Sequence, residues 1–175
     1  TAITIVKEKE MGTMEIMLVS PMKPMMIVIA KAVPYLVLSM VNIASILLLS
    51  VYVLEVPING SLSLLVLESV LFTLVSLSLG LLISAGAGSQ QTAMFISLIA
   101  LFLPTVMLSG FMFPVENMPL PLRLVSNIVP AKWYYIIVKS VMIKGMGIAG
   151  VWKETLILSG MLAFFLTLAI KKFKI

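Results

Sequence analysis

Long apolar stretches separated by a few charged residues set the pattern of this chain. No charge lies between Lys31 and Glu55, a gap of 23 residues, or between Glu68 and Glu116, a gap of 47 residues. Because about 20 apolar residues cross about 30 Å of hydrocarbon, the first gap fits one transmembrane helix and the second fits two. The second gap must therefore contain a turn, and the small and polar residues 86–91 are suited to form it.

Four transmembrane helices account for this pattern, and the fold class that we predict is an all-α membrane protein. The apolar stretches place the spans at residues 32–54, 62–84, 92–113 and 151–170. Trp152 and the lysines near the ends of the last stretch suit the membrane interface. Residues 1–6 are apolar and charges follow them directly, so we expect them to be the end of a further membrane helix and the chain to be a fragment.

Basic residues near the span ends predict the orientation, because loops that face the cytoplasm are enriched in lysine and arginine. With four spans, the lysines of residues 7–31 and of residues 171–174 lie on the same side of the membrane. We expect that side to be the cytoplasm. Five further basic residues, from Arg123 to Lys153, would then lie outside, most of them in an unusual segment treated below.

The composition agrees with a membrane protein, since 61% of the residues are hydrophobic, 11% are charged and the mean hydropathy is +1.20. Soluble domains average about 45–50% apolar and about 25% charged residues. The sequence has no Cys and no His, and its seven acidic residues are all Glu. Disulfides, thiolate nucleophiles, Cys/His metal sites and Ser-His-Asp triads are therefore excluded. We expect no catalytic residue, no metal site and no cofactor bound by this chain.

Residues 7–21, named here the N-terminal loop, have the pattern of a short amphipathic helix. One helical face is apolar and another carries carboxylates: Met11, Met14 and Leu18 on the first, Glu8 and Glu15 on the second. One interpretation is an interfacial helix that lies on lipid. The alternative is a helix that docks in a protein groove. The methionines and the near balance of lysine and glutamate favour the groove, because lipid-surface helices are usually rich in Lys and Arg.

A series of short motifs follows along the chain. These are VKEKEMGTME at residues 6–15, LVSP at 18–21, GLLIS at 80–84, QQTAM at 90–94, LSGFMFP at 108–114 and ENMP at 116–119. The series resembles that of ABC-2 type permeases, the membrane subunits of ATP-binding-cassette exporters, and the resemblance covers essentially the whole chain. Such permeases have six membrane helices. The resemblance implies that this chain runs from the end of the second helix to the C-terminus.

The resemblance also implies a cytoplasmic coupling helix in the N-terminal loop, docked on a nucleotide-binding ATPase subunit. Its residues would be Glu8, Glu10, Met11, Gly12, Thr13, Met14, Glu15 and Leu18, with the glutamates meeting basic residues of the ATPase. Gly12 keeps two interpretations, a close backbone approach to the partner or simple helix fraying. No G-x-x-x-x-G-K-[ST] phosphate-binding loop is present in the sequence, so ATP and Mg²⁺ are expected on the partner. A second permease subunit and membrane lipids are further expected partners, and nucleic acid is not.

A translocation path or outer gate is expected toward the outer side of the spans. Its candidate residues are Glu68, Pro104, Ser109, Gly110, Phe111, Trp133 and Tyr134. A carboxylate inside a span is a functional candidate by default, although Glu68 lies near the expected outer end, where water can reach it. Small residues on the same helix, such as Ser69 and Ser84, favour close helix packing. Pro104 is expected to bend its helix and to free carbonyls beside a path.

Residues 114–150 are interrupted by prolines, and the helix that we predict at residues 130–144 is too short and too charged to span the membrane. We predict that the segment forms an outer re-entrant helical hairpin. The two aromatic candidates on its helix are either gate residues or, as is commoner, interface anchors. We expect Lys132 and Lys139 to be reachable from outside by an impermeant amine reagent.

The function that the resemblance implies is that of a permease subunit of an ABC exporter. It would move an amphiphilic or hydrophobic substrate of the drug, lipid or polysaccharide class, driven by ATP hydrolysis on the separate subunit. An intramembrane enzyme is a second hypothesis, but no span holds a nucleophile together with a base. A non-energised channel or membrane assembly factor is the remaining alternative, and it has no need of a coupling helix. The expected location is a prokaryotic plasma membrane, with several passes.

Overall fold

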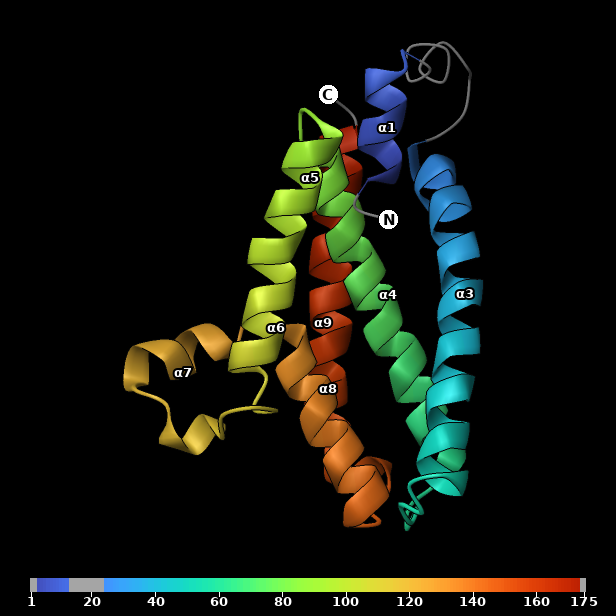
Figure 1. Ribbon diagram of the computed structural model, residues 1–175, viewed down its shortest axis with the longest axis vertical. Helices are drawn as coiled ribbons and strands as arrows, with labels where there is room; N and C mark the ends of the chain where they lie inside the picture. Colours follow the sequence, from blue (N-terminus) through green and yellow to red (C-terminus); the bar gives the residue numbers. More distant parts are fainter. Residues whose placement is uncertain (1–2, 13–23, 174–175) are drawn as a thin grey trace.

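The computed structural model describes residues 3–12 and 24–173, and all regular structure in these ranges is helical (Figure 1). The α-helices are α1 (Thr4–Glu10), α3 (Pro24–Tyr52), α4 (Leu62–Gly86), α5 (Gln90–Ser97), α6 (Leu103–Leu108), α7 (Leu120–Ser126), α8 (Pro130–Val138) and α9 (Ile148–Phe173). Two π-helical segments, η1 (Leu98–Phe102) and η3 (Lys139–Ile143), and a 3₁₀ turn, η2 (Val115–Asn117), complete the described elements.

Four of these helical stretches are long and apolar enough to cross a membrane, which confirms the predicted number of spans. They are Ile29–Tyr52, Leu62–Gly86, Gln90–Leu108 and Ile148–Lys172. The third stretch, α5–η1–α6, ends five residues before the predicted boundary. The reason is the backbone of Gly110, whose φ of +91° is incompatible with a continuing right-handed helix. The turn predicted between the second and third spans is confirmed, and Ser89 caps α5 by accepting a hydrogen bond from the Thr92 N–H.

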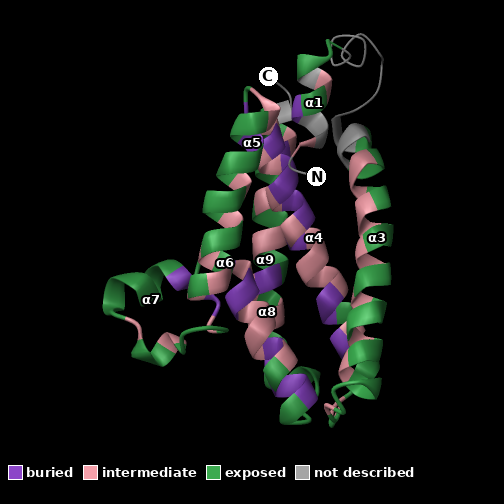
Figure 2. Cartoon of the chain, in the orientation of Figure 1, coloured by how far each residue is buried: buried purple, intermediate pink, exposed green. Residues whose placement is uncertain are grey.

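Helix α4 is the centre of the bundle, with α9 packed along it, α3 on another side and α8 against both α4 and α9. The buried core lies between α4, α8–η3 and α9 and includes Leu65, Ile137 and Leu158. Figure 2 shows this burial along α4 and α8, whereas much of α3 and α7 is exposed. Exposed apolar side chains suit contact with lipid tails. The helical backbone suits the same environment, because each helix satisfies its own backbone hydrogen bonds.

The segment after α6 does not continue down the bundle. Helix α7 lies to the side of α6, away from α4 and α9, and α8–η3 then runs antiparallel to the first half of α9 (Figure 1). The helix predicted at residues 130–144 is present as α8 and η3, and Gly145 follows it with a φ of +66°. That the segment re-enters the membrane stays a prediction.

The beginning of the chain differs from the expected coupling helix. Helix α1 continues through the charged residues to Glu10, and Gly12 then has a φ of +71°. A left-handed residue does not fit one continuous helix across residues 8–18, so the predicted helix is interrupted at Gly12. Four of the proposed coupling residues, Thr13, Met14, Glu15 and Leu18, lie outside the described residues. Helix α1 and the end of α9 lie at the same end of the bundle, as the lysine pattern predicted (Figure 1).

Candidate functional site

The N-terminal corner, made by α1, the end of α4 and the start of α5, is the first candidate site. Val6 of α1 is fully buried there against Ala87 and Ala93. Its backbone N–H donates a hydrogen bond to the Ser84 hydroxyl oxygen, at 3.2 Å. A small residue at position 84 lets α1 approach α4 closely, in agreement with the packing role predicted for it. The corner is therefore a packed joint between the first described helix and two spans.

Glu10 attaches α1 to the beginning of α5. Its carboxylate accepts a hydrogen bond from the Gln90 backbone N–H, at 2.9 Å, and another from the Gln90 side-chain amide. Gln90 is the first residue of α5, where unpaired N–H groups and the helix dipole favour a negative charge. The backbone hydrogen bond and then the side-chain hydrogen bond lower the pKa of Glu10 below its ordinary value of 4.5. At neutral pH the contact is thus between a carboxylate and a helix N-terminus.

Glu8 attaches α1 to α3 through an ion pair with Lys31, in which both side chains are half-buried. The sequence suggested that Glu8 and Glu10 face basic residues of an ATPase. In the structure both carboxylates have partners within the chain. They therefore attach α1 to α3 and α5. Met11 is 67% exposed and Gly12 is also exposed, which leaves this end of α1 open for contact with another protein.

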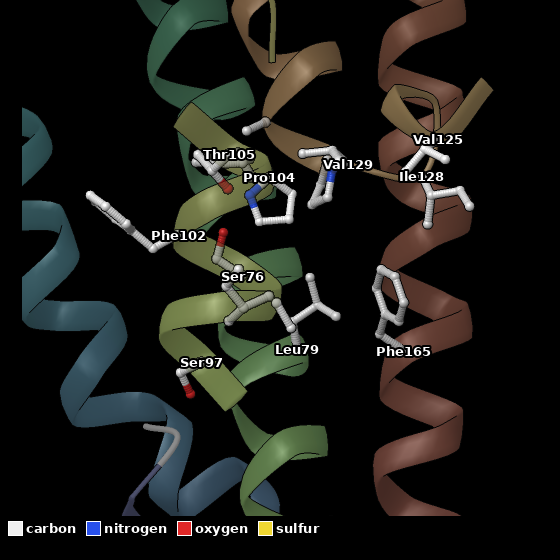
Figure 3. Close-up of a pocket in the computed structure, with 15 residues that line it drawn as sticks. Ser76, Leu79, Ser97, Phe102, Pro104, Thr105, Val125, Ile128, Val129 and Phe165 are labelled. Atoms are coloured by element: carbon white, nitrogen blue, oxygen red, sulfur yellow. The ribbon is translucent and has the colours of Figure 1, made fainter. Parts of the chain in front are cut away.

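A membrane cavity of about 540 Å³ is the second candidate site (Figure 3). It opens between α4, the α5–η1–α6 span, the junction of α7 with α8, and α9. Its lining is mostly apolar, with three hydroxyl groups: Phe72, Ser76, Leu79, Ser97, Ala100, Leu101, Phe102, Pro104, Thr105, Val125, Ile128, Val129, Pro130, Ala131 and Phe165. Such a composition suits apolar ligands or the apolar part of an amphiphile.

The helix on one side of the cavity is irregular where it meets the cavity. Segment η1 is π-helical, with the Leu103 N–H bonded to the Leu98 carbonyl, and Pro104 follows. Proline lacks an N–H and cannot complete the α-helical ladder, and single π-helical turns are frequent at functional sites. Pro104 itself lines the cavity, and its role in a translocation path stays a prediction. A second apolar cavity of about 520 Å³ lies on the other side of Pro104, against the α6–α7 connection.

Glu68 does not line either cavity. It is fully buried between α4 and α9, where one carboxylate oxygen accepts a hydrogen bond from the Thr155 hydroxyl at 2.7 Å. The other oxygen has no hydrogen-bond partner among the described residues. The expectation that Glu68 lies near enough to the outer end to be wetted is therefore wrong, because α9 and α8 cover this part of α4.

The residues that follow α6 form the turn that ends the span. The Ser109 hydroxyl is buried and accepts a hydrogen bond from the Phe111 N–H at 3.3 Å, and the Phe111 side chain is exposed. Gly110 adopts positive φ between them. These three predicted path residues are close together, but they do not belong to the lining of the main cavity.

Tyr134 lies inside a helix contact and not at a free surface. Its ring stacks on Phe72 of α4, with the ring centroids 4.4 Å apart, and its hydroxyl lies 2.8 Å from the Ser69 hydroxyl. Phe72 lines the cavity, so Tyr134 supports the cavity wall from behind. Trp133 is half-buried, and its indole N–H donates to the Asn127 carbonyl at 3.0 Å. The structure places both aromatic residues in fixed positions near the cavity.

Lys132 is a feature that the sequence pattern missed. Only 8% of it is exposed, and its ammonium group donates to the Ser126 hydroxyl at 3.1 Å and to the Asn127 side-chain oxygen at 2.6 Å. The expectation that it is reachable from outside is wrong, since the chain between α7 and α8 covers it. Lys139, expected to be reachable as well, is exposed. The sequence pattern around Lys132 does not indicate that its side chain is buried.

Comparison with known proteins agrees with this arrangement. A family model described as ABC-2 family transporter protein matches residues 1–171. The probable multidrug ABC transporter permease YbhS of Escherichia coli is 38% identical over 145 residues, which is 83% of this chain and 38% of that protein. The probable multidrug ABC transporter permease YbhR of E. coli is 34% identical over 88% of this chain and 42% of its own length. The E. coli inner membrane transport permease YhhJ is 31% identical over 99% of this chain and 46% of its own.

The chain thus spans about two fifths of the length of these three relatives. No solved structure matches it. The match over nearly the whole chain, the four apolar spans and the names of the relatives agree with one another. This chain belongs to the ABC-2 family of transporter membrane proteins and is part of an ABC transporter permease.

Proposed function

We propose that this chain is part of the transmembrane portion of an ABC exporter permease that moves amphiphilic or hydrophobic substrates. ATP hydrolysis on a separate nucleotide-binding subunit supplies the energy, and that subunit holds ATP and Mg²⁺. The names of the E. coli relatives, which are those of permeases, support this division of labour. The apolar cavity supports the substrate class, and the relatives named as multidrug permeases support transport of such compounds. A second permease subunit completes the pathway in this proposal.

The observation that carries the proposal is the bond between Glu10 and the first residue of α5. The span that starts there continues through η1 into the cavity wall, so α1 is attached directly to a helix that lines the cavity. The pair of Glu8 with Lys31 attaches α1 to α3 in the same way. Movement of the N-terminal loop by an ATPase would therefore move two spans as connected bodies.

The contact with the ATPase is assigned to the part of the loop beyond these attachments. Met11 and Gly12 are exposed at the end of α1, and Thr13, Met14, Glu15 and Leu18 follow them in the sequence. Positive φ at Gly12 does not continue the right-handed course of α1, so α1 ends before these residues. The π-helical turn before Pro104 is the place where the span bends when the joint moves, because its hydrogen-bond ladder is already interrupted.

A charge-reversal experiment tests the connection. The full-length permease and its ATPase subunit would be produced as wild type, Glu8→Lys, Lys31→Glu and the double variant, and ATP-dependent transport would be measured in inverted membrane vesicles. A partly exposed ion pair contributes about 0.2–1 kcal/mol, so each single reversal is expected to lower transport up to about fivefold. The double variant should recover most of the loss. Membrane insertion, measured by immunoblot of the vesicles, should be equal in all four.

Single reversals that transport as well as wild type would contradict the coupling role of the corner. A double variant that remains as impaired as the worse single variant would contradict the pairing.

A further inference from the structure

The α3–α4 connection, residues 53–61, is attached to the last residues of η3 at the end of the bundle opposite α1 (Figure 1). The Asn59 backbone N–H donates a hydrogen bond to the Met142 carbonyl at 3.1 Å, and the Asn59 side-chain amide donates another to the Ile143 carbonyl at 3.0 Å. The last carbonyls of a helix have no partner within the helix. Asn59 therefore supplies two of the partners that the end of η3 needs.

Two glycines allow these segments to meet closely. A Cβ on Gly60 would lie 2.4 Å from the Val141 backbone oxygen, and a Cβ on Gly145 would lie 3.4 Å from the Cβ of Asn59. Gly145 also has a φ of +66°, a conformation that glycine adopts more readily than other residues. We name the contact of Asn59 and Gly60 with residues 141–145 the latch.

The hydrogen bonds of the latch are weaker attachments than the packing beside them. Asn59, Ile143 and Gly145 are exposed, so water can replace these hydrogen bonds when they break. The side chains of Ile137 and Val141 are fully buried in the core of the bundle, where loss of packing is costly. The connection can therefore leave η3 more easily than η3 can leave the core.

A cavity beside the latch gives the connection room to move. This apolar cavity, of about 600 Å³, lies between the end of α3 and the beginning of α4, and its lining includes Leu48, Ile58, Gly60 and Val66. Close-packed interiors resist displacement, because their side chains have little free volume. Gly60 belongs both to the cavity lining and to the latch. A shift of the connection would thus open the latch without displacing a packed core.

Helix α3 links the latch to the N-terminal corner. Lys31, which pairs with Glu8 of α1, lies near the first end of α3, and Tyr52 is the last residue of the helix. Lys31 and Tyr52 are separated by about 30 Å along the helix axis. Because a helix moves largely as one body, a displacement of α3 at the corner would reach the connection.

We propose that the latch is a conformational switch, closed on η3 in the state described here and released when the ATPase displaces α3 through the N-terminal corner. Release frees the end of the α8–η3 segment, whose beginning lines the main cavity with Pro130 and Ala131. The inference rests on the proposed function and adds a regulatory contact to it. A closed latch holds the cavity wall in place, and an open latch lets it move.

A disulfide across the latch tests the proposal. The Cβ atoms of Asn59→Cys and Gly145→Cys would lie 3.4 Å apart, close to the separation found in disulfides. The full-length permease and its ATPase subunit, with any other cysteine replaced by serine, would be oxidised with copper phenanthroline, and free thiols would be counted with a mass-tagged maleimide. ATP-dependent transport in inverted vesicles should fall in proportion to the cross-linked fraction and return after reduction with dithiothreitol.

Asn59→Cys combined with Gly147→Cys is the matched control, because a Cβ on Gly147 would meet nothing within 4 Å. This pair should not form the disulfide and should transport equally before and after oxidation. Full transport by the cross-linked 59–145 pair would overturn the proposal, because the connection would then be a fixed joint. Failure of the 59–145 pair to cross-link would overturn the contact itself.

Hydrogen exchange at the Asn59 backbone amide follows the latch without any substitution. In the wild-type complex, ATP should speed exchange in a peptide that contains Asn59 severalfold, because the amide loses its Met142 acceptor when the latch opens. Equal exchange with and without ATP would overturn the switch. Faster exchange with ATP, in a complex that transports no amphiphile, would refute the proposed function and leave the latch standing.

Discussion

The hydrogen bond between Tyr134 and Ser69 leads to a quantitative prediction about how α8 is held on α4. The Ser69 hydroxyl has one hydrogen, which it donates to the Leu65 carbonyl at 2.7 Å. It therefore accepts at its other contact, so the Tyr134 hydroxyl is the donor across the 2.8 Å to Ser69. The two substitutions that break this bond leave different groups behind, and their costs should differ.

Tyr134→Phe keeps the stacking on Phe72 and leaves no donor without a partner. Its expected cost is the net value of one hydrogen bond, about 0.5–1.5 kcal/mol, and toward the lower end in a membrane protein, where such bonds average about 0.6 kcal/mol. Ser69→Ala leaves the half-buried Tyr134 hydroxyl without its acceptor, which costs about 1–3 kcal/mol. The double variant removes both groups and should cost about as much as Tyr134→Phe alone.

Unfolding of the full-length permease in mixed micelles, titrated with a denaturing detergent, measures these differences as a double-mutant cycle. Tyr134→Leu is a useful further variant, because it also loses the ring stacking, worth about 0.5–1.5 kcal/mol beyond its buried area. Costs that simply add in the double variant would refute the direct bond. A Ser69→Ala cost below that of Tyr134→Phe would refute the assignment of donor and acceptor.

Two further predictions concern the ends of the bundle. Because hydrogen bonds from Gln90 lower the pKa of Glu10, the contact stabilises α5 at neutral pH and this stabilisation is lost as the pH falls through the lowered value, below 4.5. The protection of the amides at the start of α5, measured as their exchange rate relative to an unfolded chain at the same pH, should therefore fall at acidic pH in wild type but not in Glu10→Gln, and identical pH profiles of protection would contradict the contact. At the other end, a Cβ on Gly60 would lie 2.4 Å from the Val141 backbone oxygen, whereas one on Gly147 would meet nothing within 4 Å. Gly60→Ala should lower the free energy of unfolding in detergent by about 1–3 kcal/mol, and Gly147→Ala should lower it by much less. Equal costs would mean that the α3–α4 connection, which contains Gly60, does not pack on η3.

The spacing of charges was sufficient to predict the spans. Because a charge inside hydrocarbon is costly, the two longest uncharged gaps overlap the first three candidate spans, although α4 also contains the buried Glu68. The early end of the third span was not predicted, since Gly110 and its neighbours are apolar enough to continue a span and only their backbone conformation ends it. Local pattern carries no information about such a turn unless the required φ is known.

The candidate sites were predicted less completely than the spans. The sequence identified Glu10, Pro104 and Tyr134 as functional candidates, and all three lie in the joint or around the cavity. Their partners were not predicted, because Glu10 and Gln90 are 80 positions apart and Ser69 and Tyr134 are 65 apart. Contacts at such separations depend on how the helices pack. The burial of Lys132 has the same cause, since it follows from the turn between α7 and α8.

In the proposed mechanism the N-terminal corner controls the shape of the cavity, and cysteine labelling tests this coupling. This chain has no cysteine, so, once any cysteine elsewhere in the complex is replaced by serine, a thiol placed at Ala100 in the cavity lining can be compared with one placed at Ala163 on an exposed face of α9. In the complex with the ATPase subunit, ATP is expected to change the labelling rate of Ala100→Cys severalfold and to leave Ala163→Cys unchanged. Adding Glu10→Ala should abolish the change at position 100. A labelling rate at Ala100→Cys that ATP does not alter, or that ATP alters equally when Glu10 is alanine, would contradict control of the cavity by the N-terminal corner.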